Sequence, residues 1–407
     1  MFKNNFSIFG LSEKVIFCKK CVISNQRPSS VIEFKNRDNQ KRGININKEG
    51  ICEACEYNEI KNEIDWEKRE QELLELLNKN RKKEGYDCVV PGSGGKDSAY
   101  TAHILKYKYD MNPLTVTWAP HLYTSIGWEN FINWIHIGGF DNILFTPNGK
   151  LHRLLTKLAF ENLLHPFQPF IVGQRIIGPL IAKKFGVKLV FYGENQAEYG
   201  NNKEENYNPN MKKDFFSVEN SKIIENLSLG GEKISNIIKN YGFKLNDFEP
   251  YLPINASDLE ENNIEQKYLG YYLKWDPQEC FYYASKHTGF KPNEQRTEGT
   301  YSKYSSIDDK IDPFHYYCTY IKFGLGRASY DAAQEIRNNK IDRGEGVALI
   351  KKYDSEFPKK YFSDFLEYLR ISEDNFYSTV NKFRSPHLWE FDEKKKNWII
   401  KKPIFLL

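Results

Sequence analysis

The segment SGGKDS at residues 93–98 combines the side chains and the backbone freedom that polyphosphate binding requires. Its glycines let the backbone approach an anion closely and allow the positive φ angles that turn N–H groups inward. A short, mostly apolar run at residues 87–90 precedes it and a helical pattern follows, so a helix amino terminus would also face the anion. It is not a Walker A loop, because an aspartate follows the lysine. We expect a pyrophosphate group to be bound by Ser93, Gly94, Gly95, Lys96, Asp97 and Ser98.

Four cysteines near the amino terminus form two C-x-x-C pairs: Cys18 with Cys21, and Cys52 with Cys55. Four thiolates at such spacing are the ligand set of a tetrahedral structural zinc site, which leaves no open position for catalysis. An iron–sulfur cluster and unpaired thiols are the alternatives. The other cysteines are scattered, and each is expected to be a small buried side chain and not a nucleophile: Cys88, Cys280 and Cys318.

The elements that must position these groups alternate between strand and helix. We expect strands at residues 87–90, 114–118, 142–146 and 187–192, with helical segments between them and a charged amphipathic helix at 65–84 before them. Such alternation predicts right-handed crossovers and an α/β fold, a parallel sheet with helices on both faces. The predicted divisions are a cysteine module at 1–60, a sheet domain at 61–335 with a polar insertion at about 200–246, and a helical extension at 336–407.

Composition excludes some classes of protein. The net charge is +4 over 407 residues, with Lys and Arg mixed among Asp and Glu, whereas nucleic-acid binding usually needs a basic stripe. No run approaches the ~20 apolar residues of a membrane span. The first residues lack the apolar core of a signal peptide. We therefore expect a cytoplasmic protein with reduced thiols, no membrane contact and no large nucleic-acid surface.

The string SGGKDS resembles the PP-loop of the N-type ATP pyrophosphatases, which bind the β,γ-pyrophosphate of ATP and release AMP and pyrophosphate. This likeness implies the adenine-nucleotide α-hydrolase-like version of the fold. Three further segments resemble one family, the N-acetyl sugar amidotransferases of bacterial surface-glycan biosynthesis. They are residues 116–130 (VTWAPHLYTSIGWEN), 192–200 (YGENQAEYG) and 299–310 (GTYSKYSSIDDK), the last continuing through 322–327 (KFGLGR). With the cysteine pairs, the resemblance spans most of the chain and is weakest over 200–246.

The resemblance implies that an acetamido group of a free or nucleotide-linked sugar becomes an acetamidino group. ATP would adenylate the amide oxygen, and ammonia would then displace AMP. The family likeness also implies that ammonia comes from a separate glutaminase and an ammonia-channelling partner similar to the histidine-pathway pair. Sugars of the pseudaminic or legionaminic type, both nonulosonic acids, are candidates in lipopolysaccharide or other surface-polysaccharide biosynthesis.

Catalysis of adenylyl transfer depends mostly on electrostatic stabilisation of the transition state at phosphorus and of the pyrophosphate leaving group. A Mg²⁺ ion is expected to bridge phosphate oxygens, with carboxylate ligands from Asp97, Asp308 or Asp309. The paired aspartates at 308 and 309 are flanked by Lys303 and Lys310, a composition that suits a metal–polyphosphate site. A solvated charge cluster is the alternative. The catalytic candidates are Lys96, Asp97, Lys303, Asp309 and Lys310.

Substrate contacts are expected where ligands bind in open parallel sheets, at the carboxyl ends of strands. Glu194, Asn195 and Glu198 follow the strand at 187–192, and a polar loop with local caps is the alternative. Lys322 and Arg327 are candidates for a sugar carboxylate or nucleotide phosphates, since guanidinium groups bind such anions bidentately. From the family likeness, Trp118 and His121 are expected to contact adenine or sugar.

Two other functions remain open from the sequence. A PP-loop enzyme that thiolates tRNA or makes lysidine would also combine this loop with cysteines, but it would need a basic RNA-binding domain. A zinc and ATP-binding scaffold without catalysis would form no AMP with any sugar.

Overall fold

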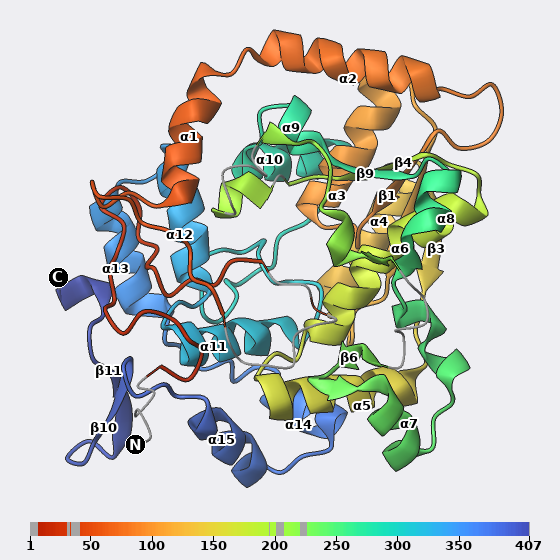
Figure 1. Cartoon of the computed structure of the whole chain (residues 1–407). Helices are drawn as coiled ribbons and strands as arrows, with labels where there is room; N and C mark the ends of the chain where they lie inside the picture. Colours follow the sequence, from red (N-terminus) through yellow and green to blue (C-terminus); the bar gives the residue numbers. More distant parts are fainter. Residues whose placement is uncertain are drawn as a thin grey trace.

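The computed structural model describes residues 7–30, 33, 41–194, 196–200, 207–219 and 226–406. Its centre is a five-stranded sheet in the order β3-β2-β1-β4-β9, with every neighbouring pair parallel (Figure 1). The strands are β1 (Cys88–Pro91), β2 (Pro113–Trp118), β3 (Asp141–Phe145), β4 (Leu189–Tyr192) and β9 (Glu265–Tyr268). The predicted parallel α/β fold is therefore confirmed.

Side chains of each strand alternate between two hydrophobic cores because successive residues of a strand point to opposite faces. In β1, Val89 belongs to one core, and Cys88 and Val90 belong to the other. The first core is covered by α5 (Gly149–Leu163) and α6 (Gln168–Lys184). The second is covered by α2 (Trp66–Asn80), α3 (Lys96–His103) and α4 (Ser125–His136). Helices on both faces leave the three central strands largely buried, whereas the edge strand β3 is partly exposed.

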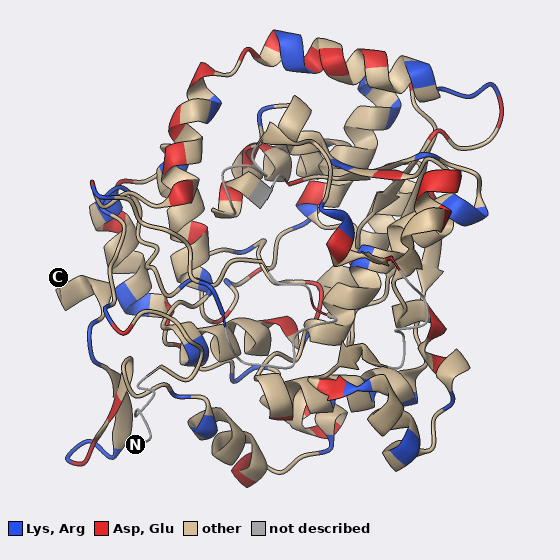
Figure 2. Cartoon of the chain, in the orientation of Figure 1, with Lys and Arg blue, Asp and Glu red and all other residues tan. Residues whose placement is uncertain are grey.

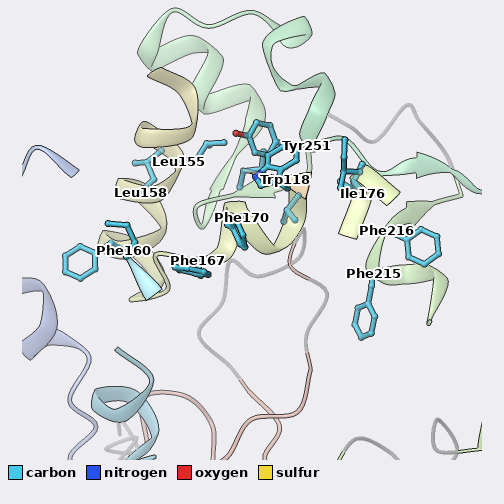
Figure 3. Close-up of a cluster of buried hydrophobic side chains, with 14 of the residues drawn as sticks. Trp118, Leu155, Leu158, Phe160, Phe167, Phe170, Ile176, Phe215, Phe216 and Tyr251 are labelled. Carbon is cyan, nitrogen blue, oxygen red and sulfur yellow. The ribbon is translucent and has the colours of Figure 1, made fainter. Parts of the chain in front are cut away.

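Aromatic side chains fill much of the first core (Figure 3). The rings of Trp118, at the end of β2, and Tyr251 lie 5.3 Å apart between centroids. Helix α6 crosses directly over the indole at Gly173, where any Cβ would come within 2.2 Å of the Trp118 ring. The absence of a side chain thus brings α6 close to the carboxyl end of β2.

The strand order contains a reversal beside β1. From β1 the chain passes outward to β2 and β3, then returns to form β4 and β9 on the other side. The connections that follow β1 and β4 therefore leave in opposite directions and open a crevice at the carboxyl ends of these strands. Open α/β sheets bind their ligands at such a switch point.

The carboxyl-terminal region packs against the cysteine module. Its helices are α11 (Asp312–Phe323), α12 (Arg327–Arg337), α13 (Arg343–Tyr353), α14 (Phe362–Leu369) and α15 (Glu373–Lys382). Figure 1 shows the red amino-terminal segment beside α12 and α13, and these elements share one buried cluster with the four cysteines. Helices were predicted as far as the carboxyl end, but an antiparallel hairpin follows them, formed by β10 (Trp389–Asp392) and β11 (Asn397–Ile400).

The remaining helices lie outside the segments described above. They include α1 (Glu53–Glu63), α7 (Ile234–Tyr241), α8 (Ala256–Glu261), α9 (Leu269–Tyr272) and α10 (Pro277–His287). Two small pairs lie within and after the predicted polar insertion: β5 (Ser217–Val218) with β8 (Ile254–Asn255), and β6 (Ser228–Leu229) with β7 (Glu232–Lys233). Within the described part of the chain, every helix is too short or too polar to cross a membrane.

Candidate functional site

The loop between β1 and α3 lies at the switch point of the sheet. Gly94 has a φ of +80°, and a Cβ there would lie 2.9 Å from the carbonyl oxygen of Asn130 in α4. Gly95 is the N-cap of α3 and has no side chain to cap the helix. The first N–H groups of α3 and the positive end of its dipole therefore face the loop, as anion binding requires.

Two charged contacts hold this loop. The Ser93 hydroxyl donates to Asp308 Oδ2 at 2.8 Å, and burial raises the pKa of Asp308. Lys96 Nζ lies 2.7 and 2.6 Å from the two oxygens of Asp97. Burial opposes the charge of Lys96, but the carboxylates of Asp97 and Glu194 outweigh it and hold the pKa of Lys96 above its usual value. Lys96 thus remains a cation beside the helix amino terminus.

A larger cavity of about 510 Å³ opens from the loop. The loop contributes Gly92, Ser93 and Ser98 to its wall, and the end of β2 contributes Trp118. Other parts of the wall come from Gln174 and Arg175 of α6 and from Arg27 of the cysteine module. The cavity therefore joins an anion-binding loop to a partly apolar floor.

A smaller cavity of about 270 Å³ includes Lys96 in its wall and is lined mainly by residues of α12 and of the segments before it. Arg327 lies in its wall, with Nε 3.1 Å from Asp331 Oδ1 and its guanidinium carbon 4.4 Å from the centroid of the Tyr316 ring. Burial opposes its charge, but Asp331 and Tyr316 raise the pKa of Arg327. The cavity thus contains a permanently charged guanidinium group.

Three side chains belong to the walls of both cavities: Asp97, Glu194 and Tyr199. Glu194 follows β4, and Tyr199 ends the 3₁₀ helix η3 (Gln196–Tyr199). The Tyr199 hydroxyl donates to Glu194 Oε2, while burial and the nearby Asp97 raise the pKa of Glu194 to about 7. A carboxyl group that changes charge near neutral pH therefore stands where the cavities meet.

Other predicted residues lie elsewhere. Asp309 accepts hydrogen bonds from the backbone of His121 and Ile311, and its Oδ2 lies 2.7 Å from His121 Nδ1. Its carboxylate is thereby occupied with protein donors, which suits positioning of the segment after β2 better than binding of Mg²⁺. His121 is buried among aromatic rings that include those of Phe167 and Phe170.

The remaining cationic candidates also lie outside both cavity walls. Lys322 is buried, its ammonium group donates to the carbonyl of Leu163 at 3.1 Å, and burial lowers the pKa of Lys322 to about 7. Lys310 pairs with Asp364 at 2.5 Å, and Lys303 is exposed. Lys310 and Lys322 thus contact protein groups away from the cavities, and the predicted roles of the three lysines stay predictions.

Two predicted substrate-binding residues remain, Glu198 and Asn195, both of which follow β4 in the sequence. Glu198 is buried and lies 2.7 Å from Lys61 of α1, which ties the loop after β4 to the cysteine module. Asn195 lies outside the described residues.

The four predicted metal ligands come together. Their sulfur atoms all lie within 4.8 Å of one another, with Cys18 Sγ 3.9 Å from Cys55 Sγ and Cys21 Sγ 3.6 Å from Cys52 Sγ. A tetrahedral zinc ion with Zn–S bonds of ~2.3 Å would separate its sulfur ligands by about 3.8 Å. All four cysteines are free and buried. The cluster can therefore hold a structural zinc ion.

Several residues of the cavity walls were missed from the sequence. Gln174 and Arg175 are adjacent polar residues in the mostly apolar helix α6. Such a polar pair indicates that the helix extends past the buried face of the sheet at this point, so it was a usable signal for both residues. Arg27, Tyr330 and Asp331 carry no comparable local pattern. Only the packing of the cysteine module and α12 against the switch point brings them to the cavities.

Comparison with known proteins supports a role in sugar biosynthesis. Residues 298–402 match a family model described as LPS biosynthesis protein WbpG-like, C-terminal domain. An uncharacterized protein of Methanocaldococcus jannaschii is 41% identical over 78 residues, which cover 19% of this chain and 27% of that protein. The chain thus matches about a quarter of that relative's length. The family match favours an enzyme of surface-glycan biosynthesis.

Proposed function

We propose that this protein is an ATP-dependent amidotransferase that converts an acetamido group of a surface-glycan sugar to an acetamidino group. The observation that carries the proposal is the SGGKDS loop at the switch point, set between two cavities that share Asp97, Glu194 and Tyr199. One cavity offers donors for a polyphosphate. The other is lined largely by residues inside the segment that matches the LPS biosynthesis family.

In this proposal ATP occupies the larger cavity. The helix amino terminus and the hydroxyls of Ser93 and Ser98 would bind the β,γ-pyrophosphate, Lys96 would approach it from the wall of the smaller cavity, and Trp118 would lie beneath the nucleoside. Mg²⁺ bound with ATP would neutralise charge on the phosphates. Asp97 fits as its ligand because its carboxylate is 33% exposed in the wall of the cavity, and Asp308 fits through its contact with Ser93.

The proposed reaction balances in two steps. The amide oxygen of the sugar attacks the α-phosphorus of ATP, and the bond to pyrophosphate breaks. Ammonia then adds to the amide carbon, AMP leaves with the former amide oxygen, and the amidine forms after loss of a proton. Fixed cations and helix N–H groups would stabilise the charge that develops on the departing pyrophosphate.

The acceptor sugar would bind in the smaller cavity. Arg327 would hold an anionic group of the sugar, and the amide would reach ATP across the shared wall of Asp97, Glu194 and Tyr199. Glu194 is placed to accept the proton that ammonia loses, because its pKa is raised to about 7 by burial and by the charge of Asp97.

A separate glutaminase with a channelling partner would supply the ammonia. Burial raises the pKa of each cysteine outside the metal cluster, so none has the thiolate character that a glutaminase nucleophile needs. The three are Cys88, Cys280 and Cys318.

The test is incubation with ATP, Mg²⁺, ammonium and a panel of free and nucleotide-linked diacetamido sugars, followed by mass spectrometry. The proposal predicts AMP together with a sugar about one mass unit lighter, as NH replaces oxygen. Formation of ADP would refute the mechanism. Formation of AMP only when tRNA is present would identify an RNA-modifying enzyme.

A further inference from the structure

The cysteine module reaches the larger cavity through the segment between its two cysteine pairs. In Figure 1 this red segment extends from α12 and α13 toward the middle of the molecule. Arg27 lies six positions after Cys21, and it lines the same cavity as Gly92, Ser93 and Ser98 of the phosphate loop. A module that the sequence suggests to be a separate structural unit thus contributes a cation to the candidate site.

The guanidinium group of Arg27 lies between two tyrosine rings. Its central carbon is 5.5 Å from the centroid of Tyr199 and 5.5 Å from that of Tyr330. Burial lowers the pKa of Arg27, but a guanidinium group keeps its charge in proteins. None of the ion pairs among the described residues includes Arg27. Within the described part of the chain, the cation therefore lies between two aromatic rings and forms no ion pair with a carboxylate.

The backbone around Arg27 is fixed on both sides. Its N–H donates to the carbonyl of Ser24 at 3.1 Å, and its carbonyl accepts from Ile44 at 2.9 Å. The neighbouring Gln26 side chain donates to Ser12 and lies 2.8 Å from His387 Nε2. The cysteine cluster anchors this segment at both ends, so metal binding would set where the guanidinium group stands.

We propose that Arg27 is a phosphate-binding residue of the larger cavity, so that binding of metal to the cysteines and binding of nucleotide are coupled. The inference rests on the proposed function, which places ATP in that cavity. A guanidinium group binds phosphate oxygens bidentately, and the tyrosine rings hold its plane in place before the ligand arrives. Its charge complements the pyrophosphate that the loop would bind in the same cavity.

Equilibrium titration of the full chain with Mg·ATP and with inorganic pyrophosphate tests the contact. We expect Arg27→Gln to weaken both affinities about tenfold to a hundredfold, the effect of losing one charge-assisted hydrogen bond. Arg27→Lys should recover part of this loss. The matched control is Arg42→Gln, which removes an exposed arginine of the same module and should leave both affinities unchanged.

The zinc content of each variant is measured alongside, so that a weak-binding variant with intact metal reports on the contact itself. Wild-type affinity in Arg27→Gln would overturn the inference while leaving the proposed function standing. Failure of the wild-type protein to bind either ligand would instead refute the proposed function.

Coupling gives a second readout that does not depend on catalysis. Because linkage between two binding equilibria is reciprocal, ATP should raise the chelator concentration that removes half of the zinc from the wild-type protein at equilibrium. The same ATP concentration should protect Arg27→Gln much less, even when it saturates both proteins. Equal protection of the two proteins, or no protection of the wild type, would overturn the coupling.

Discussion

A side chain at Gly94 would destabilise the loop at residues 93–98 in two ways, through a strained φ angle and through a steric clash, and substitutions can separate the two effects. The φ angle is +80°, and an added Cβ would lie 2.9 Å from the carbonyl oxygen of Asn130 and 3.0 Å from Cα of Phe131. Both obstacles are backbone atoms of α4 and cannot rotate away. Gly85 is the matched control because its φ is +78° and no atom lies within 4 Å of the added Cβ.

The free-energy difference follows from these geometries. A left-handed conformation costs an L-residue roughly 1–2 kcal/mol, and this cost applies at both positions. Overpacking against fixed atoms adds about 1–3 kcal/mol. We expect Gly85→Ala to lower the free energy of unfolding by about 1–2 kcal/mol and Gly94→Ala by about 2–5 kcal/mol. Because relief of the clash moves the loop, Gly94→Ala should also weaken ATP binding about tenfold or more.

Urea unfolding and calorimetric titration with Mg·ATP measure the two effects. The slopes of the unfolding curves should agree among the three proteins, so that the midpoints compare stability directly. Gly85→Ala should bind ATP like the wild type. Equal destabilisation by the two substitutions would refute the close approach of the loop to α4. Wild-type ATP affinity in Gly94→Ala would refute the role of this loop in phosphate binding.

Three further predictions follow from the site and its surroundings. Asp308→Ala removes the acceptor of the Ser93 hydroxyl and should weaken ATP binding about fivefold to tenfold in the same titration. Asp308→Asn should bind ATP more nearly like the wild type. Wild-type ATP affinity in both variants would contradict a role of the Ser93–Asp308 hydrogen bond in ATP binding. Lys322→Met should raise the melting temperature at pH 7, by a gain in unfolding free energy of about 1–4 kcal/mol. Burial lowers the pKa of Lys322 from 10.5 to about 7, so the destabilisation caused by its buried charge is full below pH 7 and fades between pH 7 and 10.5. The stability gained by Lys322→Met, measured by thermal unfolding, should fade over the same pH range. A stability gain that does not depend on pH would contradict a buried, charged Lys322. A strong chelator should release zinc and lower the melting temperature, with recovery on adding zinc back, whereas Cys52→Ser should contain little zinc from the start; a protein that melts identically with and without chelator would contradict a structural metal.

The parts of the molecule that the sequence predicted well are those set by local pattern. The loop at 93–98 needs only a strand, a glycine-rich turn and a helix in succession, and each is encoded by neighbouring residues. The cysteine pairs bring two ligands each at fixed spacing, so only one loop closure has to bring the pairs together. Four of the five strands are predicted for the same reason, because buried parallel strands are continuous apolar runs.

The parts that were missed depend on contacts between distant segments. Strand β9 has the sequence EQKY, which contains no apolar run, and its polar side chains Gln266 and Lys267 are buried only through contacts with other segments, such as that of Lys267 with Asn210. The smaller cavity is assembled from η3, α10, α12 and the segment before α11, which meet only after the whole chain has packed. Lys303, Lys310 and Lys322 lie outside both cavity walls for a related reason: a motif identifies charged residues but not the direction in which they point. The divisions at residues 60 and 335 stay predictions, since the cysteine module and α12 share one buried cluster.

The charged residues that line the smaller cavity indicate which class of acceptor molecule, a sugar or a nucleic acid, it suits better. Its wall contains more carboxyl groups than cations: Asp97, Glu194, Asp276, Asp331 and Glu335 against Lys96, Arg327 and Lys340. A nucleic-acid backbone would meet this excess of negative charge as repulsion, because its affinity depends on phosphate neutralisation. Figure 2 shows mainly acidic residues along α1 and a mixture of acidic and basic residues along α2, so these helices provide no continuous basic track either. Sugar hydroxyls and an acetamido N–H donate hydrogen bonds to carboxylates, and the single Arg327 can still bind one carboxylate of an acidic sugar. The balance of charges therefore favours a hydroxyl-rich sugar with at most one acidic group over a tRNA as the acceptor in the proposed reaction.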